Sequence, residues 1–190
     1  HDTPKFVLDS IIENLNQINR YPSTKGIPEL REAITNWLTR RFKLTKGTLY
    51  PEQHVLPVNG TREALFSFAQ CLIDENNDAL ILMPNPFYQI YEGAAYLSGA
   101  TPYFYNTIKE NNYLPDFDLI DEATWMRCQI IYICTPGNPT GSVISKQQLI
   151  RLIELSKQYD FVIASDECYS EIYFDEGSPP TGLLEAAEAW

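Results

Sequence analysis

Residues 129–141, QIIYICTPGNPTG, contain the clearest change of character in the sequence. The first six are mostly apolar and typical of a buried strand, whereas the next seven hold two prolines and two glycines around a single amide side chain, Asn138. Proline fixes the backbone angle φ, and glycine adopts angles that other residues avoid. We therefore expect a strand that ends in a rigid loop, and a loop whose geometry directs Asn138.

Outward from this stretch, apolar runs of strand length alternate with segments of helical period. Strands are expected at residues 54–58, 79–83, 101–105, 129–134 and 161–165. Helices are expected at residues 27–42, 61–73, 87–98, 117–124 and 145–159, and a further amphipathic pattern follows residues 178–182. Nearly continuous apolar strands separated by helices predict an α/β fold, in which a mainly parallel sheet is sandwiched by helices.

The composition is that of a globular chain that can bury one substantial core, with 190 residues of which 44% are hydrophobic. The formal net charge of -11 disfavours nucleic acid and acidic membranes as partners, because both are negatively charged. The four cysteines form no close pair, which indicates reduced, buried thiols and neither a disulfide framework nor a metal site. We find no membrane-spanning apolar run and no signal-peptide pattern, and we expect a cytoplasmic protein.

Ligands of parallel α/β sheets bind beyond the carboxyl ends of the strands, so the residues that follow each apolar run are the candidates for a site. Gly60, Thr61 and Arg62 begin an expected helix. Unpaired N–H groups at a helix start attract anions, which makes these residues candidates for a phosphate site. The alternative is a capped helix start that binds nothing.

An aromatic side chain follows another strand. Tyr88 comes after two prolines at the exit of the strand at 79–83, where its ring could stack on a flat cofactor. Core packing of a helix against the sheet explains the neighbouring Phe87 and Tyr91 at least as well.

A carboxylate follows the strand at 161–165. Asp166 stands where a charge is costly unless a cation or a hydrogen-bond donor meets it, and Tyr169 could direct its phenol at the same point. The alternative for Asp166 is an aspartate in a turn.

A phosphate site, an aromatic ring, an amide and a buried acid at the exits of one sheet fit a flat, phosphorylated heteroaromatic ring whose nitrogen can carry a proton. Pyridoxal 5'-phosphate has this structure. A nucleotide-binding fold of the Rossmann type is excluded by the single glycine where the G-x-G-x-x-G fingerprint has three.

The segments YPSTKGIPELREAI, VNGTREALFSF, PNPFYQIYEGA, TPGNPTG and ASDECYSEIYF follow one another in the order and rough spacing of the class I and II aminotransferases of fold type I. The resemblance covers nearly the whole chain. It implies a pyridoxal-phosphate-dependent transaminase that takes amino-acid and 2-oxo-acid substrates. Within the family, the segments PNPFYQIYEGA and SDECYSEIYFD are most similar to the members that act on N-succinyl-L,L-diaminopimelate and 2-oxoglutarate in lysine and diaminopimelate biosynthesis.

The resemblance also implies a role for each candidate residue. Asp166 pairs with the pyridine nitrogen, Asn138 and Tyr169 bind the phenolic oxygen, and the bond between Asn138 and Pro139 is cis. Tyr88 stacks on the ring, and Gly60, Thr61 and Arg62 hold the phosphate. Tyr21 reaches the phosphate of a neighbouring subunit, so a homodimer is expected. Asp166 and Tyr169 are the expected catalytic residues.

The two ends of the chain resemble cut ends, because it begins at His1 and stops within an amphipathic pattern at Trp190. We expect residues 1–190 to be part of the large cofactor-binding domain together with part of the N-terminal segment. The Schiff-base lysine and the small C-terminal domain of the family have no matching segment here, so this chain alone is expected to be inactive.

Three other functions stay open at this stage. The chain could belong to an aminotransferase for aspartate, alanine or aromatic substrates, or to a pyridoxal phosphate lyase or acyl transferase on the same scaffold. It could also be an effector-sensing domain of a transcription regulator. In the lyase or acyl transferase, the cofactor residues would be the same and only the substrate side would differ.

Overall fold

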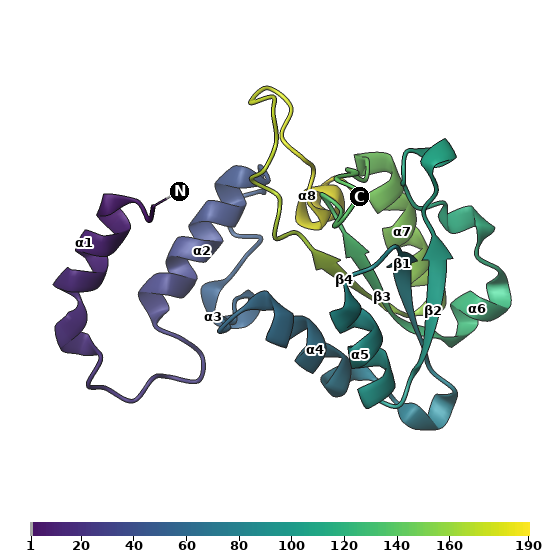
Figure 1. The fold of residues 1–190 in the computed structure, drawn as a ribbon, viewed down its shortest axis with the longest axis horizontal. Helices are drawn as coiled ribbons and strands as arrows, with labels where there is room; N and C mark the ends of the chain where they lie inside the picture. The colour runs from purple at the N-terminus through teal and green to yellow at the C-terminus, as the bar shows by residue number, and fades with distance from the viewer. Residues whose placement is uncertain (1) are drawn as a thin grey trace. The chain divides into compact units, whose positions relative to one another are not determined.

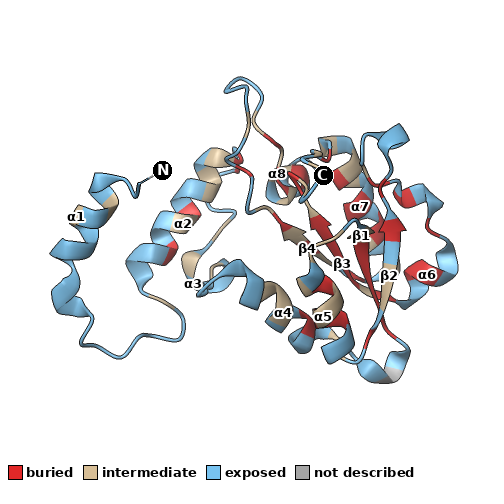
Figure 2. Cartoon of the chain, in the orientation of Figure 1, coloured by how far each residue is buried: buried red, intermediate tan, exposed pale blue. Residues whose placement is uncertain are grey.

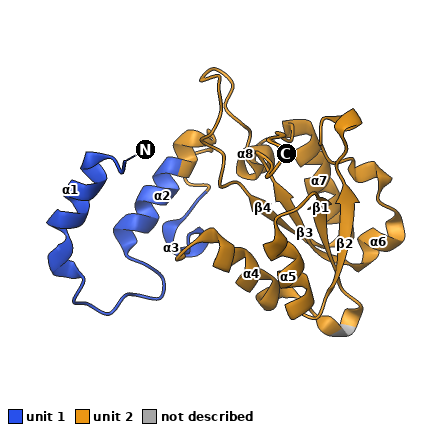
Figure 3. Ribbon diagram, in the orientation of Figure 1, with its two compact units in different colours: residues 1–37, 49–57 blue, residues 38–48, 58–190 orange. Residues whose placement is uncertain are grey.

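The computed structural model describes residues 2–190, which divide into two compact units (Figure 3). The first unit comprises residues 1–37 and 49–57, and the second comprises residues 38–48 and 58–190. None of the helices formed by the described residues is long and apolar enough to cross a lipid bilayer.

The first unit is helical in its regular parts. The structure shows α1 (Lys5–Glu13), the short 3-10 helix η1 (Leu15–Gln17), most of α2 (Pro28–Arg41) and α3 (Pro51–His54) (Figure 1). The α2 helix confirms the prediction for 27–42, and its proline at the first position has no N–H group to leave unpaired. Within this unit Arg31 is 4% exposed, and its guanidinium donates a hydrogen bond to Glu52 at 2.6 Å.

One expectation for this part of the chain is wrong, and one helix was not predicted. The strand expected at residues 54–58 does not form, because α3 ends at His54 and residues 55–58 have no regular secondary structure. Pro57 lacks the N–H group that a sheet ladder requires, so its apolar neighbours do not suffice to make a strand. The α1 helix, in turn, is absent from the predicted helices.

The second unit contains a four-stranded parallel sheet with the strand order β2-β1-β3-β4. Its strands are β1 (Leu80–Asn85), β2 (Thr101–Asn106), β3 (Cys128–Cys134) and β4 (Val162–Asp166). All four were predicted to within a few residues. The fold class, an α/β sandwich around a parallel sheet, is confirmed.

Helices precede, connect and follow the strands, and they cover both faces of the sheet (Figure 1). They are α4 (Thr61–Leu72), α5 (Gln89–Leu97), α6 (Glu122–Arg127), α7 (Lys146–Tyr159) and α8 (Leu183–Ala189), with the 3-10 turns η2 (Glu75–Asn77), η3 (Lys109–Asn111) and η4 (Phe117–Leu119). The helix expected at 117–124 is in fact η4 followed by α6. The side chain of Asp121 accepts a hydrogen bond from the Thr124 N–H at 2.7 Å and starts a new helix there.

The core consists of two clusters, one on each face of the sheet, and the strands contribute alternate residues to them. Most of β1 and β3 is coloured as buried in Figure 2. Leu82 and Ile131 belong to the cluster that packs against α6, α7 and α8. Ile81 and Ile130 belong to the cluster that packs against α4 and α5. Because β1 and β3 are buried on both faces, they show the continuous apolar runs from which the sheet was predicted.

We expect Leu82→Ala to destabilise the second unit strongly. Leu82 is fully buried in the middle of β1, and its replacement by alanine leaves a cavity that costs about 3 kcal/mol of unfolding free energy. For a chain of this length that loss lowers Tm by roughly 6 to 12 °C, measured by circular dichroism. Leu97→Ala is the matched control, because Leu97 is 70% exposed and should change the unfolding free energy by less than about 0.5 kcal/mol. Equal losses of unfolding free energy in the two variants would contradict the burial of Leu82 in the core.

Candidate cofactor-binding site

The carboxyl ends of the strands and the start of α4 surround a cavity of about 230 Å³ in the second unit. Cys134 at the end of β3 and Asp166 at the end of β4 are partners in the sheet, and the Thr135 N–H donates to the Asp166 carbonyl at 3.1 Å. The cavity is lined by Thr61, Arg62, Tyr88, Tyr91, Cys134, Asn138, Asp166, Cys168 and Tyr169. Six of these nine were predicted as site residues, although they span more than 100 positions of the sequence.

Asp166 is the buried acid of this cavity, with 8% of its surface exposed. Its Oδ2 accepts a hydrogen bond from the Tyr91 hydroxyl at 2.8 Å, and Oδ1 lies 3.4 Å from the Cys168 N–H. Burial and then the charge of Asp166 raise the pKa of Tyr91 far above its usual value. The Tyr91 hydroxyl therefore stays protonated and acts as the hydrogen-bond donor. The carboxylate therefore has one strong partner and keeps acceptor capacity for a ligand.

The loop after β3 is held by its own hydrogen bonds and directs Asn138 to the cavity. The Gly137 N–H donates to the Ser142 carbonyl at 2.8 Å, and the Thr135 hydroxyl accepts from the Ile144 N–H at 3.0 Å. The bond between Asn138 and Pro139 is cis, as predicted. Asn138 is exposed on the cavity wall, where its amide can both donate and accept.

Thr61 and Arg62 form the first turn of α4, and both line the cavity. Gly60 caps the helix with φ of 107°, an angle that favours glycine, but it does not itself line the cavity. The first N–H groups of the 12-residue helix have no partner inside the helix and carry a partial positive charge. Together with the Arg62 guanidinium they make this wall suitable for an anion.

Two predicted tyrosines complete the cavity. Tyr88 is half-buried just before α5, and its ring meets the Tyr91 ring edge-on with the centroids 5.9 Å apart. Tyr169 is 36% exposed, and the nearby Cys168 raises the pKa of its phenol above the usual value. Tyr21 belongs to the first unit and is 98% exposed, and its expected role toward a second subunit stays a prediction.

Three residues that line the cavity were not predicted as site residues: Tyr91, Cys134 and Cys168. Tyr91 was open between core packing and the site, and it does both, because it is 1% exposed and stacks on Tyr132 with the centroids 4.5 Å apart. Its position three residues after Tyr88, in the segment that follows the strand exit, was the available signal. The expectation of buried thiols holds for Cys128, but Cys71 and Cys168 are exposed.

The residues present fit pyridoxal 5'-phosphate. A phosphate matches the N-terminal turn of α4 with Arg62, and a pyridine ring matches the aromatic wall at Tyr88. The acceptor capacity left on buried Asp166 suits a protonated ring nitrogen, because a buried carboxylate needs such a partner. Asn138 and Tyr169 supply donors for a phenolic oxygen.

Comparisons with known proteins agree with this geometry. The chain is 32% identical over 189 residues to the LL-diaminopimelate aminotransferase of Desulforudis audaxviator (strain MP104C), covering 98% of this chain and 47% of that protein. It is 35% identical over 186 residues to the enzyme of the same name from Dehalococcoides mccartyi (strain ATCC BAA-2266 / KCTC 15142 / 195), covering 97% and 46%. The chain thus spans about half the length of the curated relatives it matches.

Solved structures give the same result. An aminotransferase from Neisseria meningitidis Z2491 superposes with a TM-score of 0.92 at 44% identity, covering 100% of this chain and 47% of that one. The aminotransferase AspB from Helicobacter pylori 26695 superposes with a TM-score of 0.90 at 35% identity, covering 100% and 48%. The family model for aminotransferase class I and II, whose members depend on pyridoxal phosphate, matches residues 1–189. The chain belongs to the class I and II aminotransferases.

Proposed function

We propose that the protein is a pyridoxal-phosphate-dependent transaminase of diaminopimelate and lysine biosynthesis. The observation that carries the proposal is the cavity that joins buried Asp166 to Asn138, Tyr88 and the first turn of α4. The relatives named LL-diaminopimelate aminotransferase support the substrate class. Of the diaminopimelate compounds we favour N-succinyl-L,L-diaminopimelate as amino donor and 2-oxoglutarate as acceptor, because of the segments PNPFYQIYEGA and SDECYSEIYFD.

The side chains of the cavity divide the work. When bound, pyridoxal phosphate supplies an electron-accepting ring that stabilises the negative charge left by loss of the substrate α-proton. Asp166 holds a proton on the ring nitrogen, and Asn138 and Tyr169 hold the phenolic oxygen. Thr61 and Arg62 retain the phosphate, which fixes the ring against Tyr88.

We also propose that the protein acts in the cytoplasm as a homodimer in which Tyr21 completes the neighbouring site.

The function is tested by assaying the full-length protein with 2-oxoglutarate and a set of amino donors. We expect the highest kcat/KM with N-succinyl-L,L-diaminopimelate. A higher kcat/KM with LL-diaminopimelate would show that the proposed substrate is wrong and that the proposed pathway is right. A higher kcat/KM with aspartate, alanine or an aromatic amino acid would contradict both the substrate and the pathway. Cofactor binding without turnover of any donor would instead support an effector-sensing domain.

We further propose that a polypeptide of these 190 residues does not transaminate by itself. A lysine that binds the cofactor has to lie in the cavity and be partly desolvated, so that its amine loses its proton near neutral pH. Among the described residues, no lysine lines the cavity. The seven lysines are Lys5, Lys25, Lys43, Lys46, Lys109, Lys146 and Lys157.

A further inference from the structure

The segment that follows Tyr169 has little structure of its own. Residues 171–180 form turns and irregular chain between β4 and α8, and Phe174 within them is fully exposed. The backbone hydrogen bonds inside the segment are local, such as Ile172 N–H to the Tyr169 carbonyl at 2.9 Å and Ser178 N–H to the Asp175 carbonyl at 2.9 Å. Such a segment needs contacts from outside to keep one conformation.

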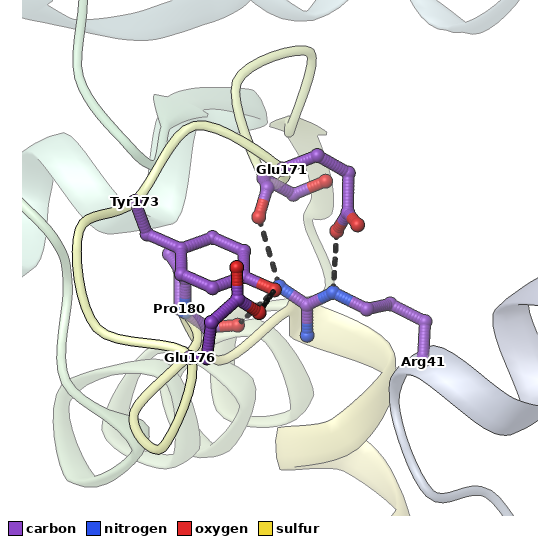
Figure 4. A network of polar contacts seen from close by, with 6 residues as sticks. Arg41, Glu171, Tyr173, Glu176 and Pro180 are labelled. Carbon is purple, nitrogen blue, oxygen red and sulfur yellow. Dashed lines mark hydrogen bonds and ion pairs between the residues drawn. The ribbon is translucent and has the colours of Figure 1, made fainter.

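Arg41, the last residue of α2, supplies those contacts within the second unit (Figure 4). Its Nη2 donates to the Ser170 carbonyl at 2.8 Å and to the Pro180 carbonyl at 3.2 Å. Its Nε donates to Glu171 Oε1 at 2.5 Å. One guanidinium thus joins the two ends of the segment, because Ser170 stands before it and Pro180 closes it.

The guanidinium is also enclosed by aromatic rings. Its Cζ lies 4.9 Å from the centroid of the Phe42 ring and 5.7 Å from that of the Tyr173 ring, and the Arg41 side chain is 9% exposed. A buried charge is costly unless its partners are well placed, and a planar guanidinium binds several acceptors in fixed directions. Arg41 therefore constrains the segment more closely than an exposed ion pair would.

The segment lines one cavity, and the residue Tyr169 just before it lines both that cavity and the cofactor cavity. Tyr169, which lines the cofactor cavity, directly precedes the Ser170 carbonyl that Arg41 binds. A second, mostly apolar cavity of about 420 Å³ shares Tyr169 and Asn138 with the first. Its remaining wall includes Phe174 and Pro180, on the segment that Arg41 closes. A shift of the segment would therefore move Tyr169 and reshape the space beside Asn138.

We propose that Arg41 is a positioning residue for the cofactor site, which acts through Ser170 and the segment 171–180 by holding the Tyr169 phenol toward the cavity. The identity of the ligand in this inference rests on the proposed function. Arg41 itself does not line the cofactor cavity. Replacing Arg41 can weaken cofactor binding only by as much as the hydrogen bond from Tyr169 to the phenolic oxygen of the cofactor contributes. The dissociation constant should therefore rise by roughly tenfold at most.

The test compares Arg41→Met, Arg41→Lys and the control Arg40→Met in the full-length protein. Arg40 is exposed and precedes Arg41 in α2, so its replacement makes the same change of charge. Hydrogen exchange of peptides covering residues 170–180 is measured without cofactor, and the dissociation constant of pyridoxal phosphate is measured by quenching of tryptophan fluorescence. The same two measurements are made for Arg41→Met in a Tyr169→Phe background.

We expect Arg41→Met to accelerate exchange of the segment by about tenfold and to raise the dissociation constant roughly 3- to 10-fold. Arg40→Met should change neither, and Arg41→Lys should recover part of both effects, because an ammonium keeps the charge without the planar fork. In the Tyr169→Phe background, Arg41→Met should add less than about twofold to the dissociation constant.

Unchanged exchange in Arg41→Met would overturn the inference. So would accelerated exchange with unchanged affinity, or an equal loss of affinity in the Tyr169→Phe background, because Arg41 would then not act through Tyr169. Failure of the wild-type protein to bind pyridoxal phosphate would overturn the proposed function and the role toward the cofactor. Because hydrogen exchange is measured without cofactor, it would still show whether Arg41 holds the segment.

Discussion

Asp166→Ala in the full-length protein is expected to lower the rate of transamination by several hundredfold while the protein remains folded. Asp166 is the buried carboxylate of the cavity, and we propose that it holds the proton on the ring nitrogen. If that ion pair stabilises the transition state by about 3 to 4 kcal/mol, its loss lowers the rate by that factor. Single-turnover kinetics with saturating cofactor measure the chemical step, and the cofactor absorbance shows that the site is loaded.

Tyr91→Phe is the matched control for this substitution. It removes the 2.8 Å hydrogen bond to Asp166 and leaves the carboxylate in place. A hydrogen bond to a charged group contributes about 1.5 to 3 kcal/mol, and water entering the cavity replaces part of it, so we expect a loss of roughly tenfold or less. Unchanged turnover in cofactor-loaded Asp166→Ala would assign the proton-holding role to another residue.

A polypeptide of the 190 residues is expected to acquire no specific lysine label when it is incubated with pyridoxal phosphate and reduced with borohydride. The lysines of α7 illustrate why. Lys146 begins that helix, where its Nζ lies 4.0 Å from Glu185, and Lys157 lies in the last turn beside the Trp190 ring, so neither lysine lines the cofactor cavity. A lysine outside the cavity cannot form a specific covalent bond with a cofactor that is held inside it.

Peptide mapping after reduction distinguishes a specific label from scattered ones, and the full-length protein treated in parallel is the control. We expect one lysine to be labelled stoichiometrically in the full-length protein and none in the 190-residue polypeptide, which should show no transamination. Stoichiometric labelling of one of the seven lysines, together with turnover, would contradict this expectation.

The fold was predictable wherever burial alone determined it. The strands β1 and β3 have apolar side chains on both faces, so their sequences could be read without knowledge of their neighbours. The failure at residues 54–58 shows the limit, because a short apolar run forms a strand only if it finds a partner with compatible hydrogen bonds. The α1 helix has no buried residue, so burial gave no signal for it.

Most residues of the site could be predicted from the sequence, but the hydrogen bonds between them could not. Thr61, Tyr88, Asn138 and Asp166 follow expected strands or begin an expected helix, and the rule that ligands bind at strand exits brings them together. The hydrogen bond from Tyr91 to Asp166 joins residues 75 positions apart, and no local pattern reveals such a pair. The bonds from Arg41 to the segment after Tyr169 were hidden for the same reason.

The two core clusters differ in the size of their side chains, and this difference bears on how the protein can evolve. The cluster against α4 and α5 contains six alanines, whereas the cluster against α6, α7 and α8 is made mainly of large aliphatic and aromatic residues. Small side chains let a helix approach the sheet closely, and α4 and α5 begin at the cavity. A larger residue in place of Ala69, Ala94 or Ala95 would therefore push α4 or α5 away from the sheet and move the part of the cavity wall that lies at the start of these helices. Substitutions of these alanines are therefore expected to change ligand binding together with stability.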